Sequence, residues 1–269
     1  MVYEIKAITT DDLREYRASL IDKKTRGETH PTRPTEAGGL SPYTLHQYIR
    51  AVRTFFKWLR EEEKIDVNPA ARLGLPRLPQ NPPKAVQEEA LLKMIEWAAQ
   101  NASKRDYALL CFLADTNARA AGVATLTVAD LNLENRTAVV REKGNGGNAR
   151  ARRVSFKQRT AQALQQWLAE RPAGDYVFVS YRAPHLSPSG IHTVIEKIAR
   201  KAGVEGRHNP HGFRHGWAMG ALRRGADLAT VSQDLGHSSV VVTAEFYARW
   251  SSKELAERHE KFSWLPEEK

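Results

Sequence analysis

The stretch NPHGFRHGWA, residues 209–218, gathers His211, Arg214 and His215 within little more than one helical turn. The Asn-Pro pair that opens it supplies a favourable N-cap and a residue suited to the first helical position, so we expect a helix to begin here. Side chains three and four residues apart are neighbours on a helix, so the three groups share one side. Because a helix N-terminus attracts anions, the cluster predicts a phosphate site. A surface cluster without function is the alternative.

Two imidazoles four residues apart also have the spacing of zinc ligands, which makes His211 and His215 a candidate metal pair. A hydrolytic zinc site of this type needs a Glu at the second position of the motif, and Gly212 stands there. We therefore expect no metal and no cofactor, and we interpret His215 as a structural residue that packs beneath the site.

Three further stretches carry side chains that could act on a phosphate: TNARAAGVATL with Arg119, VREKGNGG with Lys143, and LGHSSVVVTAEFY with His237 and Tyr247. Arg and Lys stabilise negative charge, and a tyrosine hydroxyl can attack phosphorus once a base accepts its proton. Each residue also has a simpler interpretation. Arg119 could cap a helix, Lys143 could be a solvated hairpin charge, and Tyr247 could be a core aromatic.

In their order along the chain, these stretches resemble the catalytic pattern of the tyrosine recombinase (integrase) family, with similarity from about residue 8 to residue 250. The family has an Arg after the second helix of its catalytic domain, a Lys in a β-hairpin, His-x-x-Arg, Gly-His and a final Tyr. The resemblance implies a site-specific DNA recombinase that works through a 3′-phosphotyrosyl intermediate. The matching catalytic positions are Arg119, Lys143, His211, Arg214, His237 and Tyr247.

Phosphoryl chemistry accounts for these residue types. Attack on a phosphodiester adds negative charge to the non-bridging oxygens, which suits the forked guanidinium groups of Arg119 and Arg214. A phenol with a pKa of roughly 10 needs a base, and His211 titrates near neutrality. The resemblance implies that Lys143 is the general acid for the leaving 5′ oxygen. His237 then binds the phosphate or orients the nucleophile. Neither a metal nor ATP is needed.

One position departs from the family pattern. Many members have an acidic residue three positions after the first Arg, where this chain has Gly122. That acid supports the active site without reacting, so we expect its absence to affect efficiency more than reaction type. Two alternatives stay open: a type IB topoisomerase-like enzyme that nicks and reseals DNA, and a DNA-binding protein that has lost catalysis.

The elements that must position the site are mainly helical. We predict helices over residues 86–100 and 105–119 and from residue 160 onward. The Val- and Thr-rich segment 126–156 predicts a small sheet with a hairpin whose turn is residues 144–148. The expected fold class is mainly α with a small antiparallel β-sheet, in the two-domain, DNA-clamping architecture of tyrosine recombinases.

Four prolines in residues 74–84 interrupt helical patterning and mark a domain boundary. We predict a helical, SAM-like core-binding domain at 1–78, a linker at 79–84, and a catalytic domain with a C-terminal tail at 85–269. Within the first domain, residues 25–40 read as a flexible loop and residues 41–64 as a helix. Its apolar stripe comprises Leu45, Ile49, Val52, Phe56 and Leu59.

A row of basic side chains runs beside this stripe, as on a helix that lies against a phosphate backbone, although a solvated face is an equal alternative. The residues predicted to contact DNA are Arg50, Arg53, Lys57 and Arg60 of this row, with Arg141 and Arg152 of the hairpin.

The composition agrees with a DNA-binding enzyme. The 269 residues carry a net charge of +10, and both predicted domains are basic, which favours a polyanionic partner such as double-stranded DNA. No apolar run reaches about 18 residues and no signal peptide is evident, so we expect a cytoplasmic, nucleoid-associated protein. Cys111 is the only cysteine and lies in an apolar run, so we expect it in the core.

The resemblance also implies an assembly, a tetramer on synapsed DNA in which C-terminal tails pass between protomers. The tail after Tyr247 contains the apolar residues Leu255, Phe262, Trp264 and Leu265. Because the chain begins close to the predicted core-binding domain, we expect a simple Xer-like or phage-type recombinase rather than a larger integrase with an arm-binding domain.

Overall fold

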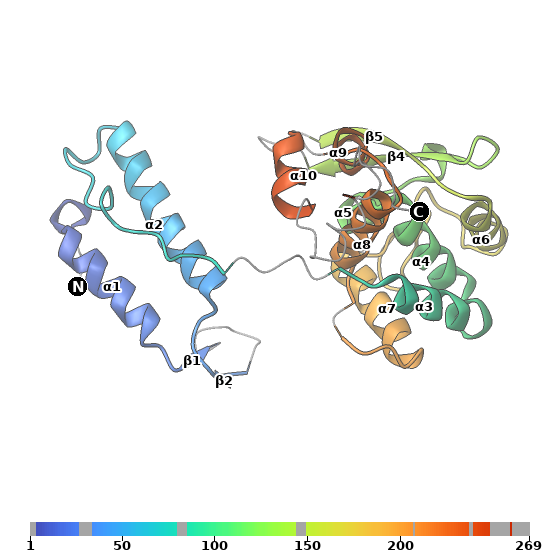
Figure 1. Ribbon diagram of the computed structural model, residues 1–269, viewed down its shortest axis with the longest axis horizontal. Coiled ribbons are helices and arrows are strands. Elements are labelled where there is room, and N and C mark those ends of the chain that lie inside the picture. Colours follow the sequence, from blue (N-terminus) through green and yellow to red (C-terminus); the bar gives the residue numbers. More distant parts are fainter. Residues whose placement is uncertain are drawn as a thin grey trace, which may run out of the picture. The chain divides into compact units, whose positions relative to one another are not determined.

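The computed structural model describes residues 4–26, 34–79, 85–143, 149–206, 208–236, 239–247 and 259. The chain divides into two compact units, Met1–Asn81 and Pro82–Lys269 (Figure 1). Helices dominate both units, and the strands form small antiparallel sheets. The predicted fold class, mainly α with a small antiparallel sheet, is confirmed.

The described residues of the first unit include the helices α1 (Thr10–Ile21) and α2 (Pro42–Glu61), preceded by the short 3₁₀ helix η1 (Ile5–Ala7). The predicted apolar stripe of α2 is confirmed, because Ile49, Phe56 and Leu59 are buried. They pack in one cluster with Leu13 and Leu20 of α1.

The segment predicted as a flexible loop contains two short strands, β1 (Thr25–Arg26) and β2 (Glu36–Ala37). They pair antiparallel, and Arg26 also bonds Glu36 at 2.6 Å across the pair. Two residues in each strand are too few to produce an alternating pattern, which explains why no strand was predicted here.

The second unit contains most of the helices. Its core lies around α4, where Leu109, Leu110 and Phe112 are fully buried and Cys111 is buried as predicted. Helix α4 contacts α3, α6 and α8. The helices are α3 (Glu88–Asn101), α4 (Lys104–Thr116), α5 (Ala120–Ala124), α6 (Gln158–Leu168), α7 (Pro188–Lys201), α8 (Pro210–Arg223), α9 (Leu228–Leu235) and α10 (Val240–Tyr247).

A three-stranded antiparallel sheet follows α5 and the 3₁₀ helix η2 (Val128–Asp130). Its strands are β3 (Leu131–Asn132), β4 (Thr137–Lys143) and β5 (Ala149–Ser155), in that order, and β4 and β5 form the predicted hairpin. Val140 lies opposite Arg152, and Lys143 lies opposite Ala149. The predicted turn, residues 144–148, lies outside the described residues.

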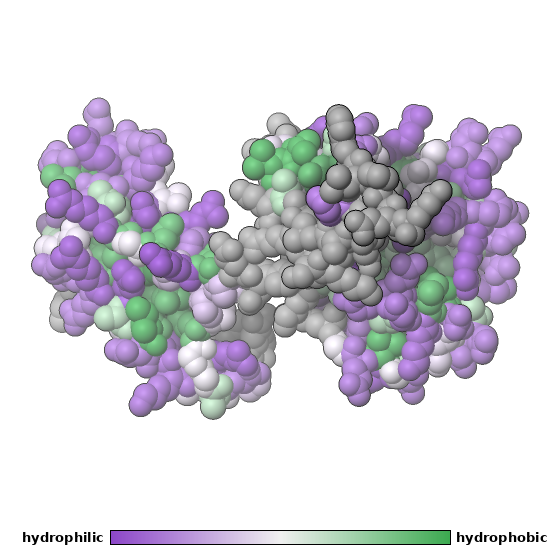
Figure 2. Space-filling model, in the orientation of Figure 1, coloured by the Kyte–Doolittle hydropathy of each residue, from purple (hydrophilic) through white to green (hydrophobic). Residues whose placement is uncertain are grey.

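The surface of the second unit is largely hydrophilic in the view of Figure 2. A hydrophobic area lies over α10, whose first residues Val240 and Val241 are 43% and 62% exposed. Among the described residues, no helix is both long and apolar enough to cross a membrane.

Candidate active site

Helix α8 begins where the sequence predicts. The side chain of Asn209 caps it by accepting a hydrogen bond from the backbone N–H of Gly212 at 2.7 Å, and a proline occupies the first turn. This start places His211 at the solvent-exposed end of the helix and Arg214 one turn further in, where it is 2% exposed. The two predicted residues therefore share one helix end but differ sharply in burial.

Arg214 connects two other segments of the chain. Its Nη1 atom donates to the carbonyl oxygen of Asn117 at 2.9 Å, and its Nη2 atom donates to the carbonyl oxygen of Leu235. Asn117 follows α4 in a left-handed conformation (φ 50°), two residues before Arg119. Leu235 ends α9, two residues before His237. One buried side chain thus holds the segments that carry two further predicted site residues.

Arg119 is the N-cap residue of α5, and its side chain is 39% exposed. Its backbone N–H donates to Oε1 of Glu142 at 2.8 Å, and its Nη1 atom donates to Oε2 of the same carboxylate at 2.5 Å. Glu142 itself is buried. The guanidinium group of Arg119 is therefore held on one side by a buried carboxylate while part of it faces solvent.

Arg119 and Arg214 both affect the protonation of His211. Although His211 is open to solvent, the surrounding protein partly desolvates its ring and lowers its pKa, and the charges of Arg214 and Arg119 lower it further. An imidazole in this position is neutral at pH 7 and can accept a proton. The structure thus brings Arg119, His211 and Arg214 into one electrostatic environment.

His215 packs against His211, with ring centroids 4.3 Å apart in an edge-to-face arrangement. His215 is half-buried, which fits a supporting position. Within the described ranges, no group of three or more His, Cys, Asp or Glu side chains is arranged to hold a metal ion.

The remaining catalytic candidates are described only in part. Lys143 is the last residue of β4 and Tyr247 the last residue of α10, and both side chains lie outside the described part of the chain. His237 lies outside it entirely; it follows Gly236, the C-cap residue of α9, which has a left-handed conformation (φ 61°). Their roles therefore stay predictions.

The two hairpin arginines predicted to bind DNA have partners within the protein. Arg141 is exposed and pairs with Asp130 at 2.5 Å. Arg152 is 13% exposed, donates to the carbonyl oxygen of Asp234 at 2.5 Å, and lies 3.3 Å from Glu142. Arg152 thus lies beside the Arg119 and Glu142 pair rather than on an open surface.

The basic row of α2 belongs to the first unit. Arg50, Lys57 and Arg60 are exposed, and Arg53 is half-buried. Lys57 also lies 3.5 Å from Glu61, one helical turn away, an exposed pair that contributes little to stability. The row is accessible to a polyanion.

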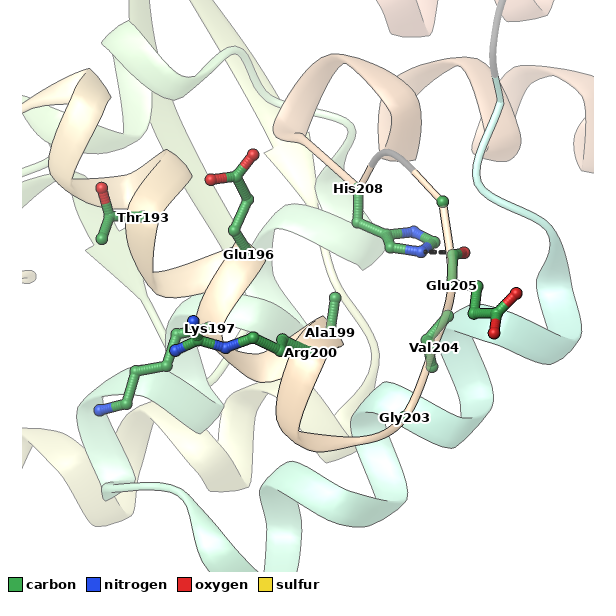
Figure 3. Close-up of a pocket in the computed structure, with 10 residues that line it drawn as sticks. Thr193, Glu196, Lys197, Ala199, Arg200, Gly203, Val204, Glu205 and His208 are labelled. Carbon is green, nitrogen blue, oxygen red and sulfur yellow. Dashed lines mark hydrogen bonds between the residues drawn. The ribbon is translucent and has the colours of Figure 1, made fainter.

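A cavity of about 680 Å³ lies elsewhere, between the end of α7 and residues 203–206 and 208 (Figure 3). Lys197, Arg200 and Glu196 line it, and the buried His208 bonds the carbonyl oxygen of Glu205 at 2.8 Å. None of the predicted catalytic residues lines this cavity. The candidate active site is therefore the cluster of Arg119, His211 and Arg214, and not this cavity.

Sequence reasoning missed Glu142. Alternation along β4 could have indicated it, because Ala138, Val140 and Glu142 all face inward and are buried. A carboxylate at an inward position of a strand needs a cationic or hydrogen-bonding partner. The sequence did not show that the partners are Arg119 and Arg152.

Comparison with known proteins identifies the family. Residues 84–254 match the phage integrase family. Tyrosine recombinase XerC of Bacillus subtilis (strain 168) is 31% identical over 76% of this chain and 70% of its own length. Tyrosine recombinase XerA of Pyrococcus furiosus is 30% identical over 85% of this chain and 77% of its own length.

A solved structure shows the same fold. XerH site-specific recombinase bound to a palindromic difH substrate superposes with a TM-score of 0.72 at 22% identity, covering 96% of this chain and 71% of that one. The family match spans more than half of the chain and includes every predicted catalytic residue. The chain belongs to the phage integrase family and is a tyrosine recombinase, an enzyme that cleaves and rejoins DNA strands through a covalent tyrosine intermediate.

Proposed function

We propose that this recombinase acts at a specific sequence in double-stranded DNA with Tyr247 as its nucleophile. The Tyr247 Oη atom attacks the scissile phosphorus, a 3′-phosphotyrosyl bond forms, and the bond from phosphorus to the 5′ oxygen breaks. His211 accepts the phenol proton, and Lys143 gives a proton to the leaving 5′ oxygen. Since the phosphotyrosyl bond conserves the energy of the broken bond, the 5′ hydroxyl of another strand can reverse the step without ATP.

Arg119 and Arg214 stabilise the growing charge on the non-bridging oxygens, and His237 binds the phosphate or orients the nucleophile. The observation that carries this assignment is the pair of hydrogen bonds from Arg214 to the carbonyl oxygens of Asn117 and Leu235. These bonds fix the segments before Arg119 and His237. The guanidinium groups of Arg119 and Arg214 are therefore in place before negative charge develops on the phosphate. Fixed donors of this kind are often the largest single contribution to catalysis.

We propose that DNA is bound by the basic row of α2 and by the second unit, which has more basic than acidic residues. XerH, whose fold this chain shares, was solved bound to a DNA substrate. Arg50, Lys57 and Arg60 expose three cations along one side of a helix, the arrangement that phosphate contacts require. We propose that Arg53 of α2 and Arg141 of β4 also contact DNA phosphates. The enzyme would act on DNA of the nucleoid, in the cytoplasm.

We further propose that four protomers act together on two synapsed sites, with each C-terminal tail docked on a neighbouring protomer. The tail sequence after Tyr247 has five large apolar residues among charged ones, which can pack against another surface: Trp250, Leu255, Phe262, Trp264 and Leu265. Val240 and Val241 of α10 form an exposed apolar surface of the kind such a tail covers. A chain that ends at residue 251 should bind DNA but assemble and recombine poorly, as measured by light scattering and strand-exchange assays.

Covalent capture tests the proposal. The protein is incubated with nicked fragments of its source genome and denatured with SDS, and the protein-bound DNA ends are sequenced. We expect adducts at one reproducible sequence, absent for Tyr247→Phe. Tyr181→Phe is the matched control, because Tyr181 is 99% exposed and remote in sequence from every predicted catalytic residue.

Two other results would overturn the proposal in different ways. Adducts scattered without sequence preference would indicate a topoisomerase-like enzyme. DNA binding without any adduct, from a protein that is folded and monodisperse, would indicate a DNA-binding protein that has lost catalysis.

A further inference from the structure

The position three residues after Arg119 is where the family resemblance predicts a carboxylate and this chain has Gly122. Gly122 lies in α5, which packs against β4. A Cβ atom built on Gly122 would lie 3.1 Å from Cγ of Glu142 and 3.2 Å from the carbonyl oxygen of Arg141. The space that a side chain at position 122 would enter is thus already filled by a carboxylic side chain from the strand.

That carboxylate contacts a backbone N–H group and two guanidinium groups. Oε1 of Glu142 accepts the backbone N–H of Arg119 at 2.8 Å and lies 3.3 Å from Nη2 of Arg152, and Oε2 accepts Nη1 of Arg119 at 2.5 Å. The Glu142 side chain is 5% exposed. Burial raises the pKa of Glu142, but the hydrogen bond from Arg119 and the charges of Arg152, Arg119 and Arg214 outweigh it, so the net pKa is lowered. Glu142 is therefore ionised at neutral pH.

We infer that Glu142 is the positioning carboxylate of this active site, and that it orients Arg119 from strand β4 in place of an acid at position 122. This rests on the proposed function, in which Arg119 binds the scissile phosphate. With its backbone and Nη1 atom held by one carboxylate, the guanidinium group of Arg119 loses little freedom when it binds an anion. A larger residue at position 122 would be in tight contact with the Glu142 side chain, which would have to shift.

Arg152 connects Glu142 to the last turn of α9. It lies on β5, opposite Val140 of β4, and its side chain joins Glu142 to the carbonyl oxygen of Asp234. Asp234 is in the last turn of α9, three residues before His237. Glu142 and Arg152 thus tie the hairpin strands to both Arg119 and the end of α9. Arg152 acts as a second positioning residue.

The experiment tests whether a carboxylate on α5 can replace the carboxylate on β4. The variants are Glu142→Gln, Glu142→Ala, Gly122→Glu and the combination of Gly122→Glu with Glu142→Ala. Glu134→Gln is the control for charge, because Glu134 is exposed in the turn between β3 and β4. Three quantities are measured: the rate of adduct formation on the captured DNA site, the DNA dissociation constant, and the 15N signals of the Arg119 guanidinium. Those signals are assigned by their loss in Arg119→Lys.

We expect Glu142→Gln and Glu142→Ala to slow adduct formation by about 10- to 100-fold, the usual loss when a supporting partner is removed, while DNA binding changes little. Gly122→Glu alone should also be slow, since it crowds two carboxylates together. The combined variant should be faster than either single variant. In the Arg119→Ala background, Glu142→Gln should add no further loss, because its effect acts through Arg119.

The guanidinium signals give a readout that does not depend on cleavage. They should be resolved in the unmodified protein, broadened in Glu142→Gln and restored in the combined variant. Unchanged Arg119 signals in Glu142→Gln would overturn the inference whether or not the protein cleaves DNA. An unchanged cleavage rate in both Glu142 variants would overturn it with the proposed function intact. Absence of any Tyr247-dependent adduct from the unmodified protein would count against the proposed function alone, and the signals would still decide the role of Glu142.

Discussion

Arg214 and Asn117 are 97 residues apart in sequence, yet Nη1 of Arg214 donates to the carbonyl oxygen of Asn117 at 2.9 Å inside the protein. Arg214 is 2% exposed and Asn117 is 4% exposed. A guanidinium group at this depth has both a structural and an electrostatic effect. It satisfies buried carbonyl oxygens, and it brings positive charge to the site that Arg119 and His211 share.

Arg214→Lys should therefore lose stability as well as activity. A lysine has one nitrogen in place of the two guanidinium nitrogens that donate here, so we expect at least one buried carbonyl to be left unsatisfied, at a cost of roughly 1–3 kcal/mol. Urea unfolding measures this cost, and SDS-resistant adducts measure activity, which we expect to fall at least about 100-fold. Arg182→Lys, in an exposed loop, is the control. A fully stable Arg214→Lys protein would contradict the buried role described here.

His211 should remain a neutral base at lower pH than an ordinary histidine, because its pKa is lowered below 6.5. The unfolded chain binds the proton more readily, so the stability contributed by neutral His211 is fully present above about pH 6.5 and is lost as pH falls through the lowered pKa. An NMR titration of the His211 ring, assigned with His211→Asn, measures the midpoint. In Arg119→Gln the midpoint should rise, since one neighbouring positive charge is gone; a midpoint that stays in place would count against the shared environment.

Gly216→Ala should destabilise the second unit. A Cβ atom at Gly216 would lie 2.4 Å from the carbonyl oxygen of Val86. The backbone of Val86 is held in place, because its N–H donates to the carbonyl oxygen of Gly212 at 3.0 Å. Relieving this overlap must shift backbone, at a cost of roughly 1–3 kcal/mol in the free energy of unfolding. Gly190→Ala in α7 is the matched control, because its Cβ meets nothing closer than 3.4 Å. Equal stabilities of the two variants would refute the close approach.

Removing the exposed cations of α2 should weaken DNA binding in a salt-dependent way. In the triple variant Arg50→Ala, Lys57→Ala and Arg60→Ala, the negative slope of log K against log salt should become shallower by about 0.9 for each lost phosphate contact. Fluorescence anisotropy with duplex DNA over a range of salt concentrations measures the slope. Arg14→Ala is the control, because Arg14 pairs with Asp11 at 2.7 Å on the surface of α1. An unchanged slope would remove α2 from the DNA contact.

The sequence by itself determined several of the elements and the class of reaction. The apolar stripe of α2, the start of α8 at an Asn-Pro pair and the hairpin of β4 and β5 follow from local patterns, because side-chain spacing and capping act over a few residues. The family followed from the order of six catalytic residue types, which chance spacing would rarely produce. The short strands β1 and β2 carried no such local signal.

Only the tertiary structure decided which partners the described charged residues contact. Sequence reasoning grouped Arg152 with the DNA contacts, and the fold places it against Glu142 and Asp234. Sequence reasoning also noted a missing carboxylate at Gly122, and the fold supplies one from β4. Such contacts join residues 10 to 97 positions apart, whose approach depends on how helices and strands pack, and no local pattern encodes it.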